Sequence, residues 1–413
     1  MNFAKENMLR KINLRHAQYF LWNRLSNVNN KKDCLEKLDS IRRIIMTNKK
    51  YSLVLVALFI TILFFYLPDT AQCQQGKVIE LAYSNFYPSP PYGISVTTEA
   101  WAREIEKRSK GRVKITIYHN GVLTSAANCY DGVVKGLSDI GQSVFSYTPG
   151  RFPVMEVIDL PGYHQYNGLI NTHVANDVYK KFKPRELDDV HVLFVHSMPP
   201  GGFCFVKKEV KVLEDFKGLR IRATGTSAEI VKVLGGSPVA MPKGDEYDAL
   251  RKGAVDGTTC GFCGLDGYRV AEVTDHCTWN PEVGYSTVKF VVMNKKKWNS
   301  LPPDIQQIFT EVSEEWIDVT GKMWAAMDAS GYQFSKKFGL KHFFPKSDEA
   351  ARWRKAVCGP LYDRYIKVLE AKGLPGKEVL EYRQQAIEKY SKMYLPPEFF
   401  KEAVKEAEAI KIK

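Results

Sequence analysis

The stretch of sequence that decides the fold is residues 217–225, which read KGLRIRATG. Its apolar side chains face one side of a strand, because successive side chains of an extended chain alternate in direction. Arg220 and Arg222 face the other side. The Thr-Gly turn at the end of the stretch leads into a helix that is expected from Ser227 and is stopped by two glycines at 235–236. A strand, a turn and a helix in this order form the repeating unit of an α/β fold.

The same alternation of strands and helices extends over most of the chain. Before this stretch, strands are expected at 78–83, 113–118, 140–145 and 191–196, and helices at 95–110, 125–136 and 169–182. A second group begins near Phe203, with a short strand expected at 238–241, a helix at 245–252 and another strand from 254. Such units predict two α/β groups, each with a mostly parallel sheet covered by helices.

The last part of the chain is predicted to be helical. One long helix is expected from Pro302 to about Phe338, opened by a Pro-Pro pair in its first turn. Beyond residue 348 the sequence is helical and charged, with breaks expected at 359–360, 373–375 and 396–397. Two α/β lobes and a long helix suit a ligand cleft between domains, although they would suit many enzymes as well.

The positive charge of the chain is concentrated at its start. Residues 1–50 hold twelve Lys and Arg against four Asp and Glu, so they carry eight of the thirteen formal positive charges. A nucleic-acid-binding protein should instead cluster its basic residues on the folded domain. We therefore expect no nucleic-acid partner and assign this charge to a leader.

The leader has the pattern of a secretory signal. An apolar run at 51–67 follows two lysines and ends at Pro68 and the small-residue exit Ala71-Gln72-Cys73. This predicts a signal peptide over 46–73, with cleavage after Cys73, and a periplasmic protein. An uncleaved membrane anchor is the alternative, because about 17 apolar residues lie at the bottom of the spanning range. Residues 1–45 do not fit a signal peptide, so we interpret them as a non-native extension and expect translation to start at Met46.

Signatures of catalysis and metal binding are weak. The sequence has no GxSxG elbow, Walker loop, strand-associated GxGxxG or HExxH motif. Cys260 and Cys263 have the CxxC spacing that can serve redox chemistry or half of a zinc site. The following His276 and Cys277 are adjacent, so they lack metal-ligand spacing. We expect no cofactor, no metal site and no enzyme, and instead two half-buried thiols or a local disulfide.

Six cysteines follow the predicted leader, and an exported protein with an even number can form disulfides. Their pairing does not follow from the sequence. They are Cys129, Cys204, Cys260, Cys263, Cys277 and Cys358.

Arg222 is the main candidate for ligand recognition. It lies nearest the carboxyl end of its strand, where open α/β sheets bind their ligands. An arginine there presents a planar fork that matches a carboxylate with two parallel hydrogen bonds. Thr224 and the residues after it lead into a helix whose first amides also favour an anion. The alternative is an ordinary strand-edge arginine paired to a neighbouring acid.

Several motifs in a fixed order resemble the solute-binding subunit of TRAP transporters, which are tripartite periplasmic uptake systems. They are KGLRIRATG at 217–225, GGSPVAMP at 235–242, EYDAL at 246–250, GAVDG at 253–257, YDGVVKGLSDIG at 130–141, and LPPDI at 301–305 after the strand at 290–294. The resemblance covers nearly all of the chain after the leader.

This resemblance implies a two-lobed periplasmic binding protein of the type II-like α/β class, with lobes joined by hinge strands and braced by the long helix. It places 77–199 and about 288–335 in lobe I, and 200–287 and about 336–395 in lobe II. Residues 396–413 are expected to form a charged C-terminal helix. It also implies a small organic-acid ligand and membrane TRAP subunits as partners.

The family's carboxylate-binding arginine falls on Arg222, whereas Arg220 is expected to face solvent or form a salt bridge. A second arginine of sialic-acid-binding members is missing near Cys204. Aromatic residues surround the expected cleft instead, and they suggest one carboxylate on an apolar or aromatic body. The residues predicted to bind the ligand are Arg222, Thr224, Tyr87, Phe145, Tyr147 and Phe262, within a wider aromatic set that adds Phe86, Tyr92 and Trp279.

The prediction is an extracytoplasmic solute-binding protein that captures an organic acid when its lobes close. Two alternatives stay open at this point. One is an exported envelope sensor or interaction domain that binds the same acids, and the other is a thiol-dependent exported α/β enzyme using Cys260 and Cys263.

Overall fold

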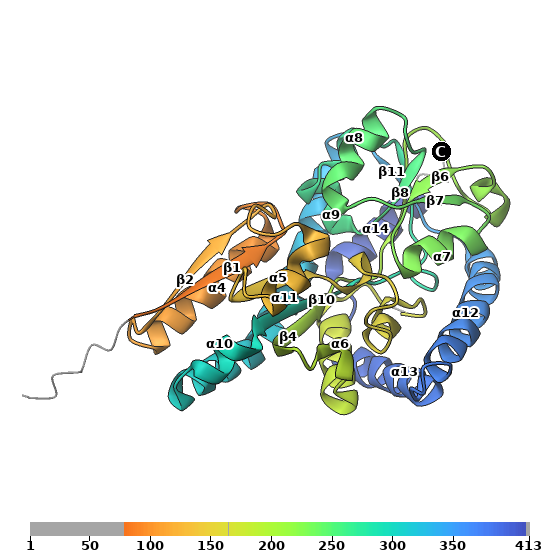
Figure 1. Ribbon diagram of the computed structural model, residues 1–413. Helices are drawn as coiled ribbons and strands as arrows, with labels where there is room; N and C mark the ends of the chain where they lie inside the picture. The colour runs from red at the N-terminus through yellow and green to blue at the C-terminus, as the bar shows by residue number, and fades with distance from the viewer. Residues whose placement is uncertain (1–77, 164, 410–413) are drawn as a thin grey trace, which may run out of the picture. The chain divides into compact units, whose positions relative to one another are not determined.

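The computed structural model describes residues 78–163 and 165–409 (Figure 1). The predicted extension (1–45) and signal peptide (46–73) lie outside these residues. Among the helices of the described part, none is long and apolar enough to cross a membrane.

The first lobe is built on a five-stranded sheet with the order β2-β1-β3-β10-β4. The β1 strand pairs in parallel with β2 and β3, whereas β10 is antiparallel to both β3 and β4. Its strands are β1 (Ile79–Asn85), β2 (Val113–Tyr118), β3 (Ile140–Val144), β4 (Val190–Ser197) and β10 (Val288–Asn294). Its helices are α4 (Gly93–Arg108), α5 (Cys129–Val134), α6 (Gly168–Phe182) and α10 (Lys295–Ser300).

The second lobe has a six-stranded sheet with the order β11-β9-β5-β8-β6-β7. The β6 strand pairs in parallel with β7 and β8. The β5 strand is antiparallel to both β8 and β9. Its strands are β5 (Gly202–Phe205), β6 (Arg220–Arg222), β7 (Ser237–Val239), β8 (Gly257–Cys260), β9 (His276–Thr278) and β11 (Lys341–Phe343). Its helices include α7 (Thr226–Val233), α8 (Glu246–Arg251) and α9 (Phe262–Gly267).

Both sheets are mostly parallel, as expected, but mixed, because one strand in each, β10 in the first and β5 in the second, runs against the others. The βαβ units give the parallel pairs, but the chain also passes between the two sheets in two short segments, before a long helix leads it back to β11 of the second sheet. It leaves the first sheet after β4 and enters β5, and it returns from β9 into β10. The β10 strand runs opposite to its neighbours β3 and β4 in the first sheet. The β5 strand likewise runs opposite to its neighbours β8 and β9 in the second sheet.

The long helix α11 (Pro303–Lys336) contacts elements of both lobes, as Figure 1 allows the reader to follow. On the first lobe, Ser313 Oγ accepts a hydrogen bond from Trp101 Nε1 at 3.3 Å. On the second lobe, Asp328 Oδ1 accepts one from the Cys263 amide at 2.8 Å. The predicted long helix is confirmed, and it packs on α4, α6 and α9.

Three helices follow: α12 (Ser347–Glu370), α13 (Gly376–Met393) and α14 (Glu398–Ala409). The break predicted at 359–360 is wrong, because Pro360 lies inside α12. Proline removes one backbone donor, but Pro360 is on the exposed face, where water can satisfy the freed carbonyl group. The opposite face holds the helix in place through buried Trp353, Val357 and Leu361. In Figure 1, α12 lies beside α7, while α13 packs on α6 of the first lobe.

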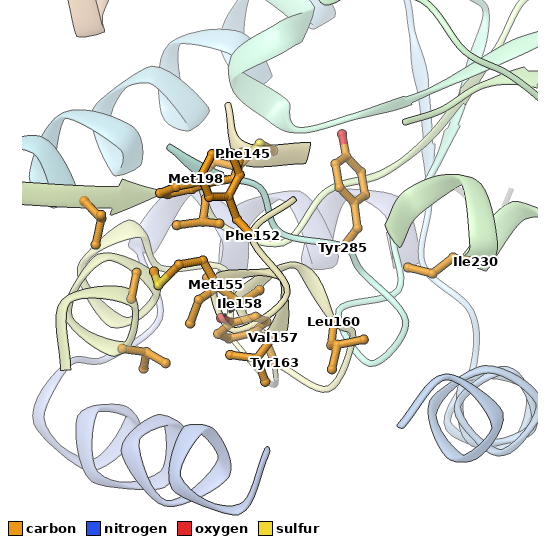
Figure 2. Packing of buried hydrophobic residues seen from close by; sticks show 14 of the residues in the cluster. Phe145, Phe152, Met155, Val157, Ile158, Leu160, Tyr163, Met198, Ile230 and Tyr285 are labelled. Atoms are coloured by element: carbon orange, nitrogen blue, oxygen red, sulfur yellow. Dashed lines mark hydrogen bonds between the residues drawn. The ribbon is translucent and has the colours of Figure 1, made fainter. Parts of the chain in front are cut away.

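A cluster of buried aromatic and aliphatic side chains surrounds the segment after β3 (Figure 2). Figure 2 shows Phe145 and Phe152 close together, with Met155, Ile158 and Tyr163 in the same cluster. The rings of Phe145 and Phe152 meet edge to face at 4.9 Å, the arrangement that aromatic pairs favour. This packing fixes the segment after β3 in place.

A disulfide joins Cys204 in β5 to Cys277 in β9, residues that face each other in the antiparallel register. It closes a loop between residues 73 positions apart. Cys129, Cys260, Cys263 and Cys358 are free and buried.

Removing this disulfide with Cys204→Ala and Cys277→Ala should lower the free energy of unfolding by about 4 kcal/mol, because a loop of this length gains that much entropy in the unfolded chain. Urea unfolding followed by circular dichroism measures the change. Dithiothreitol should destabilise the wild type and leave the double variant unaffected. Equal stability of the two proteins would contradict the prediction.

Candidate functional site

A cavity of about 60 Å³ lies between the two lobes, close to both crossovers. Side chains from both sheets, from α9 and from α11 contribute to it. Its lining consists of Phe86, Tyr87, Tyr92, Val144, Tyr147, Met198, Arg222, Thr224, Lys243, Gly261, Cys263, Gly264, Tyr268, Tyr285, Thr287, Lys289 and Trp324. Aromatic rings and three basic side chains dominate this lining.

Arg222 is the last residue of β6, and only 4% of it is exposed. Its Nε and Nη2 donate hydrogen bonds to the carbonyl oxygen of Met241, at 3.0 and 2.8 Å. These bonds fix the plane of the guanidinium group and leave its Nη1 edge for another acceptor. Arg222 is buried because the second lobe folds the segment after β7, which contains Met241, over it.

Arg220 differs from Arg222 although both lie on one strand. It is exposed, and its Nη2 pairs with Asp256 Oδ1 at 2.8 Å. It faces solvent and forms a salt bridge, as the sequence predicts. The acid partner that the alternative interpretation assigned to Arg222 is thus found on Arg220, whereas the hydrogen bonds of Arg222 go to Met241.

Lys243 lies beside Arg222 on the second lobe. Its Nζ forms an ion pair with Glu246 Oε1 at 2.5 Å and lies 3.5 Å from Cys260 Sγ. Burial lowers the pKa of Lys243, but the neighbouring acidic groups of Cys260 and Glu246 raise it by more, so the ammonium form is favoured. Arg222, Lys243 and the buried Glu246 together carry one formal positive charge.

Lys289 enters the cavity from the start of β10 on the first lobe. Its Nζ donates to the Thr287 carbonyl oxygen at 2.6 Å and lies 4.5 Å from the centre of the Trp324 ring. Burial lowers the pKa of Lys289 to about 7, and raises that of Asp159 to about 8 and that of Asp328 to about 7.

The lobes meet around the cavity. The Lys243 amide donates to Tyr147 Oη at 3.4 Å, and the rings of Tyr92 and Tyr268 meet at 5.6 Å. Gly225 has a φ of +52°, and a Cβ added there would lie 2.6 Å from the Cβ of Ser146. Only glycine permits both this conformation and this approach of the lobes.

Four of the six predicted ligand-binding residues line the cavity: Arg222, Thr224, Tyr87 and Tyr147. The amide of Thr224 already donates to Ser227 Oγ at 3.0 Å, so the expected anion-binding amides at this turn are partly occupied. Phe86 and Tyr92 of the wider aromatic set also line the cavity.

Phe145 and Phe262 lie in the core, outside the cavity lining. Phe145 packs on Phe152 and on Phe290, whose ring centre is 5.1 Å away. Phe262 stacks on Trp279 at 3.7 Å and is fully buried. Each of the two is adjacent in sequence to a residue that lines the cavity, but its ring packs in the core.

Sequence reasoning missed Lys243, Lys289, Tyr268, Tyr285 and Trp324, which all line the cavity. Lys243 had a usable signal, because it follows the carboxyl end of a short strand as Arg222 does. Lys289 also had one, since it is a lone charge at the start of an otherwise apolar strand. Within residues 78–163 and 165–409, no group of three or more His, Cys, Asp or Glu side chains is arranged to hold a metal ion.

A family model described as bacterial extracellular solute-binding protein, family 7, matches residues 88–368. The chain belongs to this family, and the resemblance to TRAP solute-binding proteins is confirmed. These proteins bind small organic acids and work with membrane components. Members of the family are the substrate-binding components of transporters.

Relatives and solved structures agree with this assignment. A solute-binding protein of Albidiferax ferrireducens is 26% identical over 52% of this chain, and the match spans 64% of that relative's length. A TRAP periplasmic solute-binding protein of Desulfovibrio salexigens is 30% identical, with a TM-score of 0.67 over 76% of this chain and 96% of that one. A TRAP solute-binding protein of Rhodoferax ferrireducens, solved with copurified benzoate, is 25% identical. Its TM-score is 0.71, and the match covers 76% of this chain and 99% of that one. Two-lobed TRAP binding proteins therefore share this fold.

Arg222→Lys should weaken binding of a carboxylate ligand about tenfold to a hundredfold, because lysine keeps the charge but loses the planar fork. Arg220→Lys is the matched control, since it changes the same residue type two positions away, at the exposed end of the strand. Calorimetric titration of both variants measures the effect, with circular dichroism to check folding. Equal losses, or a larger loss at position 220, would mean that Arg222 is not the carboxylate-binding residue.

Proposed function

We propose that this protein is an extracytoplasmic solute-binding protein that captures an aromatic monocarboxylate and delivers it to the membrane subunits of a TRAP transporter. The observation that carries the proposal is the free Nη1 edge of a buried arginine, held by Met241, in the aromatic cavity between two lobes. A ligand bound there would contact both lobes and hold them together.

The charge of the second-lobe wall supports a monocarboxylate. Arg222 and Lys243 contribute two formal positive charges, and Glu246 removes one of them. A single carboxylate on the Arg222 fork would neutralise the remainder. Burial of an uncompensated charge is costly, so a neutral and an anionic ligand should differ strongly in affinity.

The aromatic lining supports an aromatic body for the ligand. Tyrosine rings reach the cavity from both lobes, among them Tyr87 and Tyr147 on the first lobe and Tyr268 on the second. Rings of this kind stack on or meet edge to face with a planar ligand. The benzoate that copurified with the Rhodoferax ferrireducens protein is a ligand of this class.

The buried thiols favour binding over thiol catalysis. Burial raises the pKa of Cys260 to about 11 and raises that of Cys263 well above its usual value. Both thiols are therefore protonated at neutral pH, and the thiolate is the reactive form. Their protonation therefore disfavours a role for Cys260 and Cys263 as the nucleophiles of an exported enzyme.

Aromatic acids should raise the melting temperature of the purified protein, whereas their neutral amides and alcohols should not. Benzoate with benzamide, and phenylacetate with phenylethanol, are matched pairs that differ chiefly in the charge facing Arg222. An acid at 100 times its dissociation constant should stabilise the folded state by about 2.7 kcal/mol. A thermal-shift titration checks this, with Arg222→Lys as the binding-deficient control. Stabilisation by the neutral partners alone, or by sugars alone, would contradict the proposal.

A further inference from the structure

The first-lobe side of the cavity contains a buried lysine without a close counter-charge. Only 3% of Lys289 is exposed. Its contacts are the Thr287 carbonyl oxygen and the face of Trp324, and no carboxylate of the described residues lies within ion-pair distance of its Nζ. A buried amino group with unused N–H donors is costly unless another acceptor reaches it. The cavity is where such an acceptor can enter.

A second polar group with an unmet hydrogen bond lies on the same wall. The hydroxyl group of Tyr87 is buried and has no hydrogen-bond partner among the described residues. The Tyr87 ring meets Trp324 edge to face at 6.4 Å, so Tyr87 and Lys289 both contact this tryptophan. Two polar groups without sufficient partners thus lie around one aromatic ring of the cavity lining.

The charges behind this wall disfavour a second carboxylate. Asp159 and Asp328 are both buried and interact electrostatically with Lys289. Asp159 also accepts a hydrogen bond from the Val288 amide at 2.7 Å, and Asp328 from the Cys263 amide at 2.8 Å. Because burial lowers the pKa of Lys289 to about 7 and raises those of Asp159 and Asp328 to about 8 and about 7, this wall carries little net charge at pH 7, while the N–H donors of the lysine stay available. An uncharged oxygen atom therefore fits this wall better than an anion.

We infer that Lys289 and Tyr87 bind an uncharged oxygen substituent of the ligand, a hydroxyl or an oxo group carried at a distance from its carboxylate. The lysine donates to this oxygen, and the tyrosine hydroxyl donates to it or accepts from it. The inference rests on the proposed function and narrows it to oxygenated aromatic monocarboxylates. Arg222 then fixes one end of the ligand and the pair on the opposite lobe fixes the other.

The test compares each oxygenated acid with its unsubstituted parent by calorimetric titration at pH 7. The probes are 3- and 4-hydroxybenzoate against benzoate, and 3- and 4-hydroxyphenylacetate against phenylacetate. At least one oxygenated acid should bind the wild type about tenfold more tightly than its parent. Tyr87→Phe and Lys289→Met should each bring this ratio down toward one, whatever happens to the affinity for the parent. Phthalate and terephthalate should gain nothing over benzoate.

Tyr130→Phe is the matched control, because Tyr130 is a buried tyrosine of the same lobe whose hydroxyl has a partner in Asp189 and which does not line the cavity. It should keep the wild-type ratio. Circular dichroism checks folding, and Tyr87→Phe carries the test if Lys289→Met fails to fold. The inference is overturned if no oxygenated acid exceeds its parent, if the ratio survives in Tyr87→Phe, or if a dicarboxylate binds best. If no aromatic acid binds at all, the proposed function itself fails.

Discussion

The binding site depends on how a guanidinium group is held inside the protein. Arg222 ends a strand of only three residues, and one backbone carbonyl group, that of Met241, accepts from two of its nitrogen atoms. Taking a charge out of water is costly, so the surrounding chain must offset this cost with fixed dipoles and counter-charges. The nearby Glu246 does so only in part, because it also pairs with Lys243. This shortfall of one negative charge beside Arg222 is what the proposed carboxylate of the ligand would make good.

The rest of the architecture keeps the two walls of the cavity in register. The chain crosses between the lobes in two short segments, and α11 contacts both lobes. Asp328 on this helix accepts from the amide of Cys263, which lines the cavity on the second lobe. Trp324, one turn earlier, lines the cavity beside Lys289 of the first lobe. The α11 helix therefore supplies a ring to one wall of the cavity and anchors the start of α9, which contributes to the other wall.

Local sequence patterns predicted most elements of this fold, because a βαβ unit is specified by alternation, capping and turn residues that lie close together in the chain. Sheet direction was harder to predict, since the antiparallel pairs of β5 and β10 arise from strands distant in sequence. Pro360 was misjudged for a similar reason. Its helix continues because the opposite face is buried against other elements, which no local rule contains. The pairing of Cys204 with Cys277 also depends on such distant register.

For the site residues too, local sequence predicted some positions, whereas others depend on contacts that are distant in sequence. Arg222 was predictable from its place at a strand end, whereas the direction of an aromatic ring depends on its neighbours in three dimensions. Phe262 and Cys263 are adjacent in the sequence, yet the ring stacks on Trp279 in the core and the thiol lines the cavity. Lys289 extends this argument. A lone lysine in an apolar strand is a local conflict between sequence and burial, and such conflicts tend to mark functional positions. A lysine in so apolar a setting is therefore better explained by a ligand than by stability.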